Sequence, residues 1–163
     1  MQISEKVQQL LNDQINLEFY SAQLYLALSI YFNLQNYEGF AKYMASKFDE
    51  ETDHALKIID FMTKVNISVE LKDIKAPQIN PISVVDPFSS AYYHEKDITQ
   101  AINGIYQAAV AEGDFSVMSL MKDFIDEQVE EEGEALLNYT SINRVKDDIG
   151  AVEALNSEFM HKK

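Results

Sequence analysis

Four long stretches of the sequence repeat apolar residues at the spacing of an α-helix, and almost none of the chain alternates as a β-strand would. The stretches cover residues 4–33, 40–65, 87–112 and 114–142, and the third begins somewhere between 83 and 87. Long helices that follow one another through short turns pack antiparallel in a bundle. The pattern therefore predicts an all-α fold built on a four-helix bundle.

One connection is much longer than a turn. Residues 66–82, which include Pro77 and Pro81, match neither a helix nor a strand. A loop of this length in a compact domain needs a structural reason, and a crossover along the bundle, returning the chain to its far end, provides one. A last segment, roughly 147–160, predicts a short fifth C-terminal helix.

Residue types that commonly begin or end helices stand at the predicted boundaries. They are Ser4 before the first helix, Asn36 and Gly39 before the second, Asp86 and Pro87 as N-cap and first residue of the third, and Gly113 and Asp114 before the fourth. The boundaries agree with the apolar periodicity, so both signals predict the same order of helices.

Composition limits the classes of protein that this chain can represent. Its 163 residues, 47% hydrophobic, suit a single domain over 1–163. A formal charge of −14 argues against a nucleic-acid partner, and the absence of cysteine excludes disulfides and thiolate-bound metals. The N-terminus lacks the pattern of a leader peptide, and no apolar run is long enough to span a membrane. We therefore expect a cytoplasmic protein without a membrane partner.

A polar side chain interrupts the inner stripe of every predicted long helix near its middle. The interruptions are Glu18 in the first helix, Glu51 with His54 in the second, Glu95 in the third, and Gln128 with Glu131 in the fourth. Residues three apart leave a helix from the same face. The Glu51 and His54 side chains can therefore bind a common ligand.

The interruptions share one spacing. Glu18 and Glu95, Glu51 and Gln128, and His54 and Glu131 are each 77 positions apart. Two hairpins packed about a pseudo-two-fold axis would bring these groups together at one depth. Several carboxylates inside a bundle are very costly unless cations neutralise them. The shared register therefore predicts a metal site inside the bundle.

Each residue also has an ordinary structural explanation. A single glutamate on a helix is usually solvated, and Gln128 can be an interior amide hydrogen-bonded to a neighbour as well as a ligand. Tyr25, two turns after Glu18, can be a core aromatic or can act beside the metal site. The acidic run 126–134 is either a solvated face or, with Glu50, a second carboxylate cluster.

The ligand types favour particular metals. Carboxylates with an imidazole and no thiolate suit iron or manganese. Ferritin-like di-metal proteins place a Glu on two helices and Glu-x-x-His on the other two. The first hairpin has this motif in EETDH, residues 50–54, whereas the second has Gln128 and Glu131 at the matching positions.

With these motifs, the chain resembles the non-haem ferritins of the bacterial type. The resemblance covers nearly the whole chain, from NLEFYSAQLYL through EETDH and AYYHEKDITQAIN to DEQVEEE. It implies that Glu18, Glu51 and His54 bind a first iron ion. It implies that Glu51, Glu95 and Glu131 bind a second, so that Glu51 bridges the two.

Further residues match the family outside this di-iron centre. Gln128 matches a glutamine beside the centre and Tyr25 a nearby tyrosine. The resemblance also implies a third, weaker iron site formed by Glu50, Glu127 and Glu130 with Glu131.

The resemblance further implies a function. Such a protein is a ferroxidase that oxidises Fe(II) to Fe(III) with dioxygen or hydrogen peroxide. It stores the product as ferric oxyhydroxide in a hollow homo-oligomer of 24 subunits, with the fifth helix at the four-fold contacts.

Three other kinds of protein are alternatives to a non-haem ferroxidase. Bacterioferritin has a haem-ligating methionine where this chain has Thr52, so no haem is expected. A rubrerythrin-like peroxidase would need cysteine-bound iron. A passive metal-binding shell would have similar ligands, and the sequence separates it poorly from a ferroxidase, although the intact Glu51 and Tyr25 favour catalysis.

Overall fold

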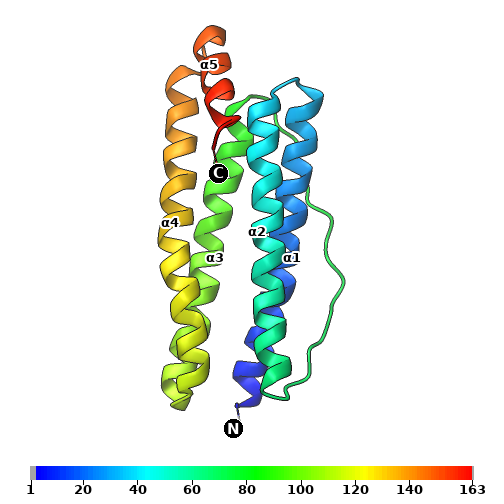
Figure 1. Ribbon diagram of the computed structural model, residues 1–163, viewed down its shortest axis with the longest axis vertical. Coiled ribbons are helices and arrows are strands. Elements are labelled where there is room, and N and C mark those ends of the chain that lie inside the picture. Colours follow the sequence, from blue (N-terminus) through cyan, green and yellow to red (C-terminus); the bar gives the residue numbers. More distant parts are fainter. Residues whose placement is uncertain (1–2, 163) are drawn as a thin grey trace.

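The protein is an elongated helical bundle (Figure 1). A computed structural model describes residues 3–162, and residues 1, 2 and 163 of the predicted single domain lie outside this part. The helices are α1 (Glu5–Leu34), α2 (Glu38–Lys64), α3 (Val85–Glu112), α4 (Phe115–Val145) and the short α5 (Ile149–Phe159). Residues 3–162 contain no strand, which confirms the all-α prediction.

The two hairpins pack as predicted, α1 against α2 and α3 against α4, with further contacts between α1 and α3. The connection 66–82 runs along the bundle beside α1 and returns the chain to the far end (Figure 1). Asn12 of α1 holds the start of this connection in place. The Asn12 side chain donates from Nδ2 to Ser68 O at 3.3 Å and accepts at Oδ1 from Glu70 N at 2.8 Å. The predicted crossover is thus confirmed.

The caps of α1 and α4 are confirmed as well. Ser4 Oγ accepts from Val7 N, and Asp114 Oδ1 accepts from Val117 N, so each side chain satisfies a free N–H in a first turn. Gly113, at φ 69°, ends α3 in the left-handed conformation that glycine tolerates best.

α3 begins at Val85, within the interval 83–87 that the sequence predicted, but its predicted cap is wrong. Asp86 does not act as the N-cap. Its Oδ2 instead reaches back to accept from Ile82 N at 2.8 Å and Ser83 N at 2.9 Å. Pro87 still lies in the first turn, where its missing N–H leaves no helical bond unmade.

Gly39 does not separate α1 from α2 as predicted, since it lies in the first turn of α2. A Cβ placed on Gly39 would meet the backbone oxygen of Asn156, in α5, at 1.7 Å. The neighbouring Phe40 N donates to Asn156 Oδ1 at 3.1 Å. Glycine is needed here because α5 approaches α2 this closely.

The buried core consists of two apolar clusters with polar side chains between them. The lower cluster holds residues such as Val7, Leu11, Ile58, Ile102 and Met121. The upper cluster is rich in aromatic rings, including Phe32, Phe40, Phe88 and Phe159. Between the two clusters lies a polar layer of buried side chains: Glu18, Ser21, Glu51, Glu95 and Gln128.

Candidate metal centre

The polar layer brings together acidic groups from all four long helices. The structure forms two groups whose ligand atoms all lie within 4.8 Å of one another. The first triad is Glu18, Glu51 and His54, and the second triad is Glu51, Glu95 and Glu131. Glu51 belongs to both triads. Two cations bound at the triads would therefore be neighbours that share a carboxylate.

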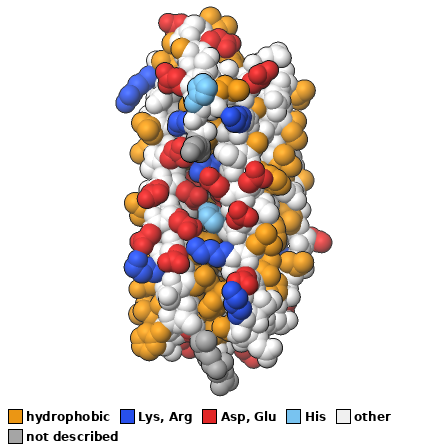
Figure 2. Space-filling view, viewed as in Figure 1, with side chains coloured by type: hydrophobic (Ala, Val, Ile, Leu, Met, Phe, Trp, Pro, Cys, Tyr) orange, Lys and Arg blue, Asp and Glu red, His pale blue; other side chains and the backbone are white. Residues whose placement is uncertain are grey.

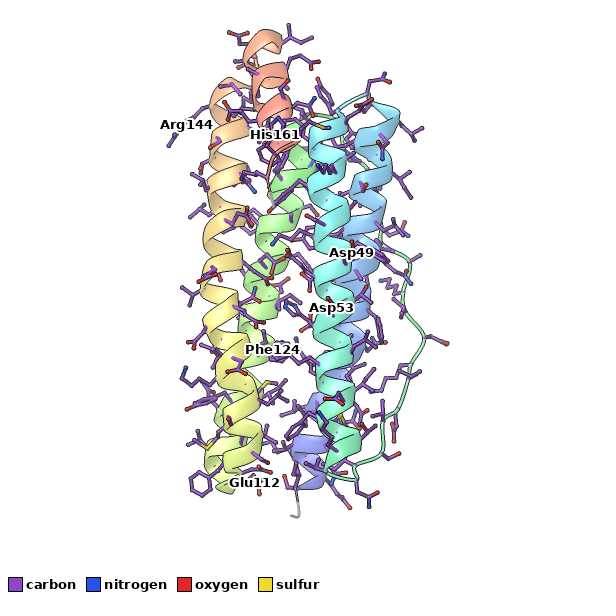
Figure 3. All side chains as sticks on the ribbon, viewed as in Figure 1. Asp49, Asp53, Glu112, Phe124, Arg144 and His161 are labelled. Carbon is purple, nitrogen blue, oxygen red and sulfur yellow. The ribbon has the colours of Figure 1, made fainter. Side chains whose placement is uncertain are left out.

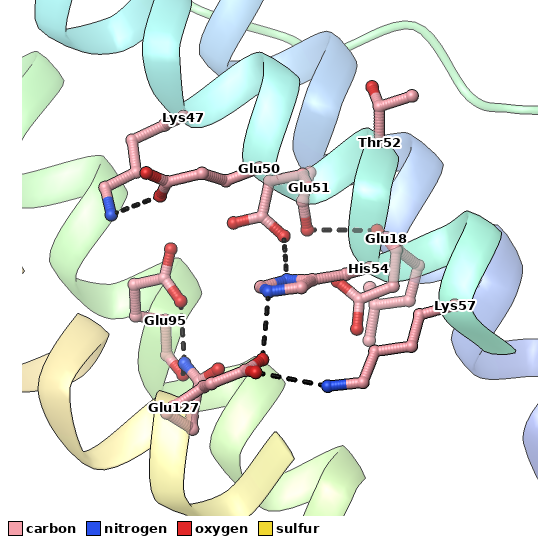
Figure 4. Close-up of polar contacts among 12 residues, drawn as sticks. Glu18, Lys47, Glu50, Glu51, Thr52, His54, Lys57, Glu95 and Glu127 are labelled. Atoms are coloured by element: carbon pink, nitrogen blue, oxygen red, sulfur yellow. Dashed lines mark hydrogen bonds and ion pairs between the residues drawn. The ribbon is translucent and has the colours of Figure 1, made fainter. Parts of the chain in front are cut away.

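The carboxyl groups of the first triad need a proton or a cation between them. Among the described residues, no donor group reaches Glu18 Oε2 or Glu51 Oε1, although both atoms are buried. The two carboxyl groups lie against each other instead (Figure 4). Buried anionic oxygens without donors are very costly, so a metal ion fits this arrangement.

Burial and mutual repulsion raise the carboxyl pKa values. Burial and the charge of Glu51 hold the pKa of Glu18 well above its usual range. Burial and the charges of Glu95 and Glu131 do the same to the pKa of Glu51. Burial and Glu95 raise the pKa of Glu131 to about 7. Without metal, these carboxyl groups bind protons more tightly than free carboxyl groups do. Cation binding would release the bound protons.

Replacing Glu131 with glutamine is expected to stabilise the metal-free protein at pH 8. The raised pKa means that the folded state binds this proton more tightly than the unfolded state does. The stabilising contribution is therefore complete below pH 4.5 and is lost as pH rises through 7. We expect Glu131→Gln to raise the free energy of unfolding by at most about 3 kcal/mol at pH 8.

Urea denaturation at pH 5 and pH 8 tests this expectation. The two proteins should differ much less at pH 5 than at pH 8. Glu112→Gln, at the exposed end of α3, is the control and should change stability little at either pH. A wild-type protein as stable as Glu131→Gln at pH 8 would show that burial and neighbouring charges do not raise the pKa of Glu131.

Several side chains hold the ligands in position. Gln14 Nε2 donates to Glu18 Oε1 at 2.7 Å. Glu95 is held from both sides, because Tyr25 Oη donates to its Oε1 and Gln128 Nε2 donates to its Oε2 at 2.7 Å. Gln128 thus lies in the layer as the interior amide that the sequence allowed as one alternative.

His54 is also fixed from two sides. Its Nδ1 lies 3.5 Å from Glu51 Oε2, and its Nε2 lies 3.3 Å from Glu127 Oε2. The ring of Phe124, which lies between α4 and α2 (Figure 3), packs 5.4 Å from the imidazole, centroid to centroid. A carboxylate on one ring nitrogen orients the other nitrogen toward a metal.

An acidic pocket opens along the seam between α2 and α4, beside the second triad. It has a volume of about 380 Å³ and is lined by Lys47, Glu50, Glu127, Glu130, Glu131 and Glu134. Figure 2 shows acidic side chains gathered with basic ones on this face. Glu50, Glu127 and Glu130, expected at a third site, lie here, yet they do not converge as the two triads do. Their role as ligands stays a prediction.

Sequence reasoning missed three partners of the centre. Gln14 was not connected with the centre, and only its place one turn before Glu18 could have indicated it. Lys47 and Lys57 were not considered, and only their places one turn from Glu51 and His54 could have indicated them. His94, which was not assigned to the centre, is half-buried, and its Nε2 lies 2.7 Å from Ser21 Oγ.

Comparisons with known proteins agree with this geometry. The family described as Ferritin-like domain matches residues 8–142 of the chain. The chain belongs to the ferritin family. It is 35% identical over 130 residues to the bacterial non-heme ferritin of Campylobacter jejuni, covering 80% of this chain and 78% of that protein. The bacterial non-heme ferritin of Staphylococcus aureus is 30% identical over 158 residues, 96% of this chain and 94% of that one.

Solved ferritins have the same fold as this ferritin. An open pore ferritin from the hyperthermophilic archaeon Archaeoglobus fulgidus superposes with a TM-score of 0.97 at 33% identity, covering 99% of this chain and 100% of that one. A variant of PmFTN soaked in iron superposes with a TM-score of 0.91 at 32% identity, covering 94% and 98%. Within residues 3–162 of this ferritin, no helix has the length and apolar character to cross a membrane.

Proposed function

We propose that this ferritin is an iron-storage protein and a ferroxidase. It oxidises Fe(II) to Fe(III) with dioxygen or hydrogen peroxide at the two triads and stores the product as ferric oxyhydroxide. The observation that carries this proposal is the sharing of Glu51 between two neighbouring ligand triads. Its relatives named as bacterial non-heme ferritins support the choice of iron.

The chemistry follows from the ligand set. Carboxylates are hard, anionic ligands, so four of them with one imidazole favour Fe(III) over Fe(II). Metal ions in paired sites commonly lie about 3.5–4 Å apart. Each Fe(II) loses one electron, so a pair supplies the two electrons that convert dioxygen, with two protons, into hydrogen peroxide.

The residues of the centre have distinct roles in this proposal. Glu18 and His54 complete the first iron position, and Glu95 and Glu131 complete the second. The raised pKa of Glu131, near 7, lets it release a proton when iron binds. The positioning side chains Gln14, Tyr25 and Gln128 keep Glu18 and Glu95 oriented.

Storage requires an enclosed space that one chain does not provide. The close structural match to archaeal ferritins supports a homo-oligomer, for which we propose a hollow shell of 24 subunits. In this shell α5 would line the four-fold contacts. Its exposed Ile149 is an apolar side chain that a neighbouring subunit could cover.

Stopped-flow oxidation of Fe(II) by dioxygen on the metal-free protein tests the proposal. We expect a fast phase that saturates near two iron ions per chain. Native mass measurement should give a large homo-oligomer. Oxidation no faster than in buffer would reduce the protein to a passive metal binder, and a monomeric mass would exclude mineral storage.

A further inference from the structure

The acidic pocket between α2 and α4 already contains cations, and they belong to the protein. Lys47 Nζ lies 2.6 Å from Glu50 Oε2 (Figure 4) and 3.4 Å from Glu134 Oε2. It therefore joins two of the carboxylates that line the pocket, one from each of the helices that form the seam. A metal ion bound to the same oxygens would have to displace this ammonium group.

Lys47 is not a mobile surface lysine. Its side chain is only 10% exposed, and the ammonium group lies 5.9 Å from the centre of the Tyr43 ring. The stem is enclosed between α2 and α4, so moving the charge out to water would leave a gap and would remove the ammonium partner of Glu50, while Glu134 would keep Lys162 as its ammonium partner, 3.5 Å away. Removing one partner of a largely buried ion pair is costly, which keeps the ammonium in the pocket.

A second lysine, Lys57, pairs with one of the carboxylates that line the pocket. Lys57 Nζ lies 3.1 Å from Glu127 Oε1, while the other oxygen of Glu127 faces His54 Nε2 at 3.3 Å. One oxygen of Glu127 is therefore paired with an ammonium group, and the other faces the imidazole of the first triad without accepting a hydrogen bond from any described residue. A metal ion bound by Glu127 would have to compete with Lys57 for this carboxylate.

These contacts conflict with the third iron site that the sequence resemblance implies. Of its expected ligands, Glu50 is paired with Lys47 and Glu127 with Lys57 and His54. A divalent cation bound to Glu50 and Glu127 would lie close to the largely buried ammonium group of Lys47 and to that of Lys57, and like charges a few ångströms apart repel strongly where water is partly excluded.

We propose that Lys47 takes the place of a third metal ion, so that this ferritin binds two metal ions per chain at the triads and none in the acidic pocket. The inference rests on the proposed di-iron function. Lys47 is then the residue that sets the metal stoichiometry, and Lys57 supports it by holding Glu127.

The test is anomalous diffraction from crystals of the metal-free protein soaked in Zn²⁺. Wild-type protein should show two zinc peaks per chain in the bundle, one at each triad, and none among Glu50, Glu127 and Glu130. Lys47→Gln keeps most of the side-chain volume and removes the charge, so it should add a third peak in the pocket. Lys47→Arg keeps the charge and should show two peaks, as in the wild type.

Lys122→Gln is the matched control, because Lys122 pairs with Asp126 on the exposed face of α4, and it too should leave two peaks. A third peak in the wild type, with Lys47 displaced, would overturn the inference while leaving the di-iron centre intact. A Lys47→Gln protein with zinc at the triads alone would also overturn it. Empty triads in every variant would instead contradict the proposed function itself, and the inference with it.

Discussion

Replacing Glu51 with alanine is expected to abolish the fast phase of Fe(II) oxidation. Glu51 is the one carboxylate common to both triads, so the substitution removes a ligand from each metal position and the connection between them. Losing a residue that merely orients a ligand commonly costs about 10–100-fold in metal affinity or activity. We therefore expect the rate of the fast phase, measured by stopped flow, to fall more than about 100-fold.

The variant should still fold, because the substitution removes a buried carboxyl group whose pKa is raised by burial and by its neighbours. Circular dichroism and native mass are the checks. Glu130→Ala is the control, since Glu130 is exposed on α4 and belongs to neither triad. It should retain the fast phase at close to the wild-type rate. Equal losses in both variants would contradict the assignment of Glu51 as a bridge.

Gly39→Ala is expected to detach α5 from the bundle. The new methyl group would lie 1.7 Å from the backbone oxygen of Asn156, a contact that no rotamer change relieves. Displacing α5 would break the hydrogen bond from Phe40 N to Asn156 Oδ1 and expose Val152 and Phe159. Overpacking a core costs about 1–3 kcal/mol, and a loss of this size lowers Tm by about 2–12 °C in a protein of this length.

Differential scanning calorimetry measures the change, and native mass reports the effect on assembly, which the proposed four-fold contacts of α5 would make severe. Gly104→Ala is the matched control. Gly104 also lies within a helix, but nothing is within 4 Å of its added Cβ, and alanine favours a helix by about 1 kcal/mol. It should be neutral or stabilising. A Gly39→Ala protein with wild-type Tm and mass would show that α5 can shift without cost.

The order of the helices was predictable because each long helix carries a regular apolar stripe and most carry a recognisable cap. Asp86 was wrongly assigned as the N-cap of α3 because aspartate commonly caps a helix from the position before it, whereas here Asp86 accepts hydrogen bonds from inside the first turn. Gly39 was misread because its importance comes from α5, which is more than a hundred positions away in the chain. Such long-range contacts leave no local pattern.

The triads were predictable for a different reason. A carboxylate in an apolar stripe is costly to bury, so it indicates a bound partner. The common spacing of 77 positions between the hairpins indicates that these polar side chains lie close together in the folded protein. The lysines of the acidic pocket offered no comparable signal, since a lysine next to glutamates on a helix is usually solvated. Only the seam between α2 and α4 shows that Lys47 is enclosed.

The division of the core into two apolar clusters has a consequence for how the helices align. If one long helix slid along its neighbours by a single turn, about 5.4 Å, its polar side chain would leave the layer and enter one of the clusters. An unpaired carboxylate there would cost several kcal/mol, whereas one apolar side chain replacing another would cost little. The polar layer thus fixes the axial register of all four long helices at once. The apolar residues above and below it contribute stability but do not by themselves set this register.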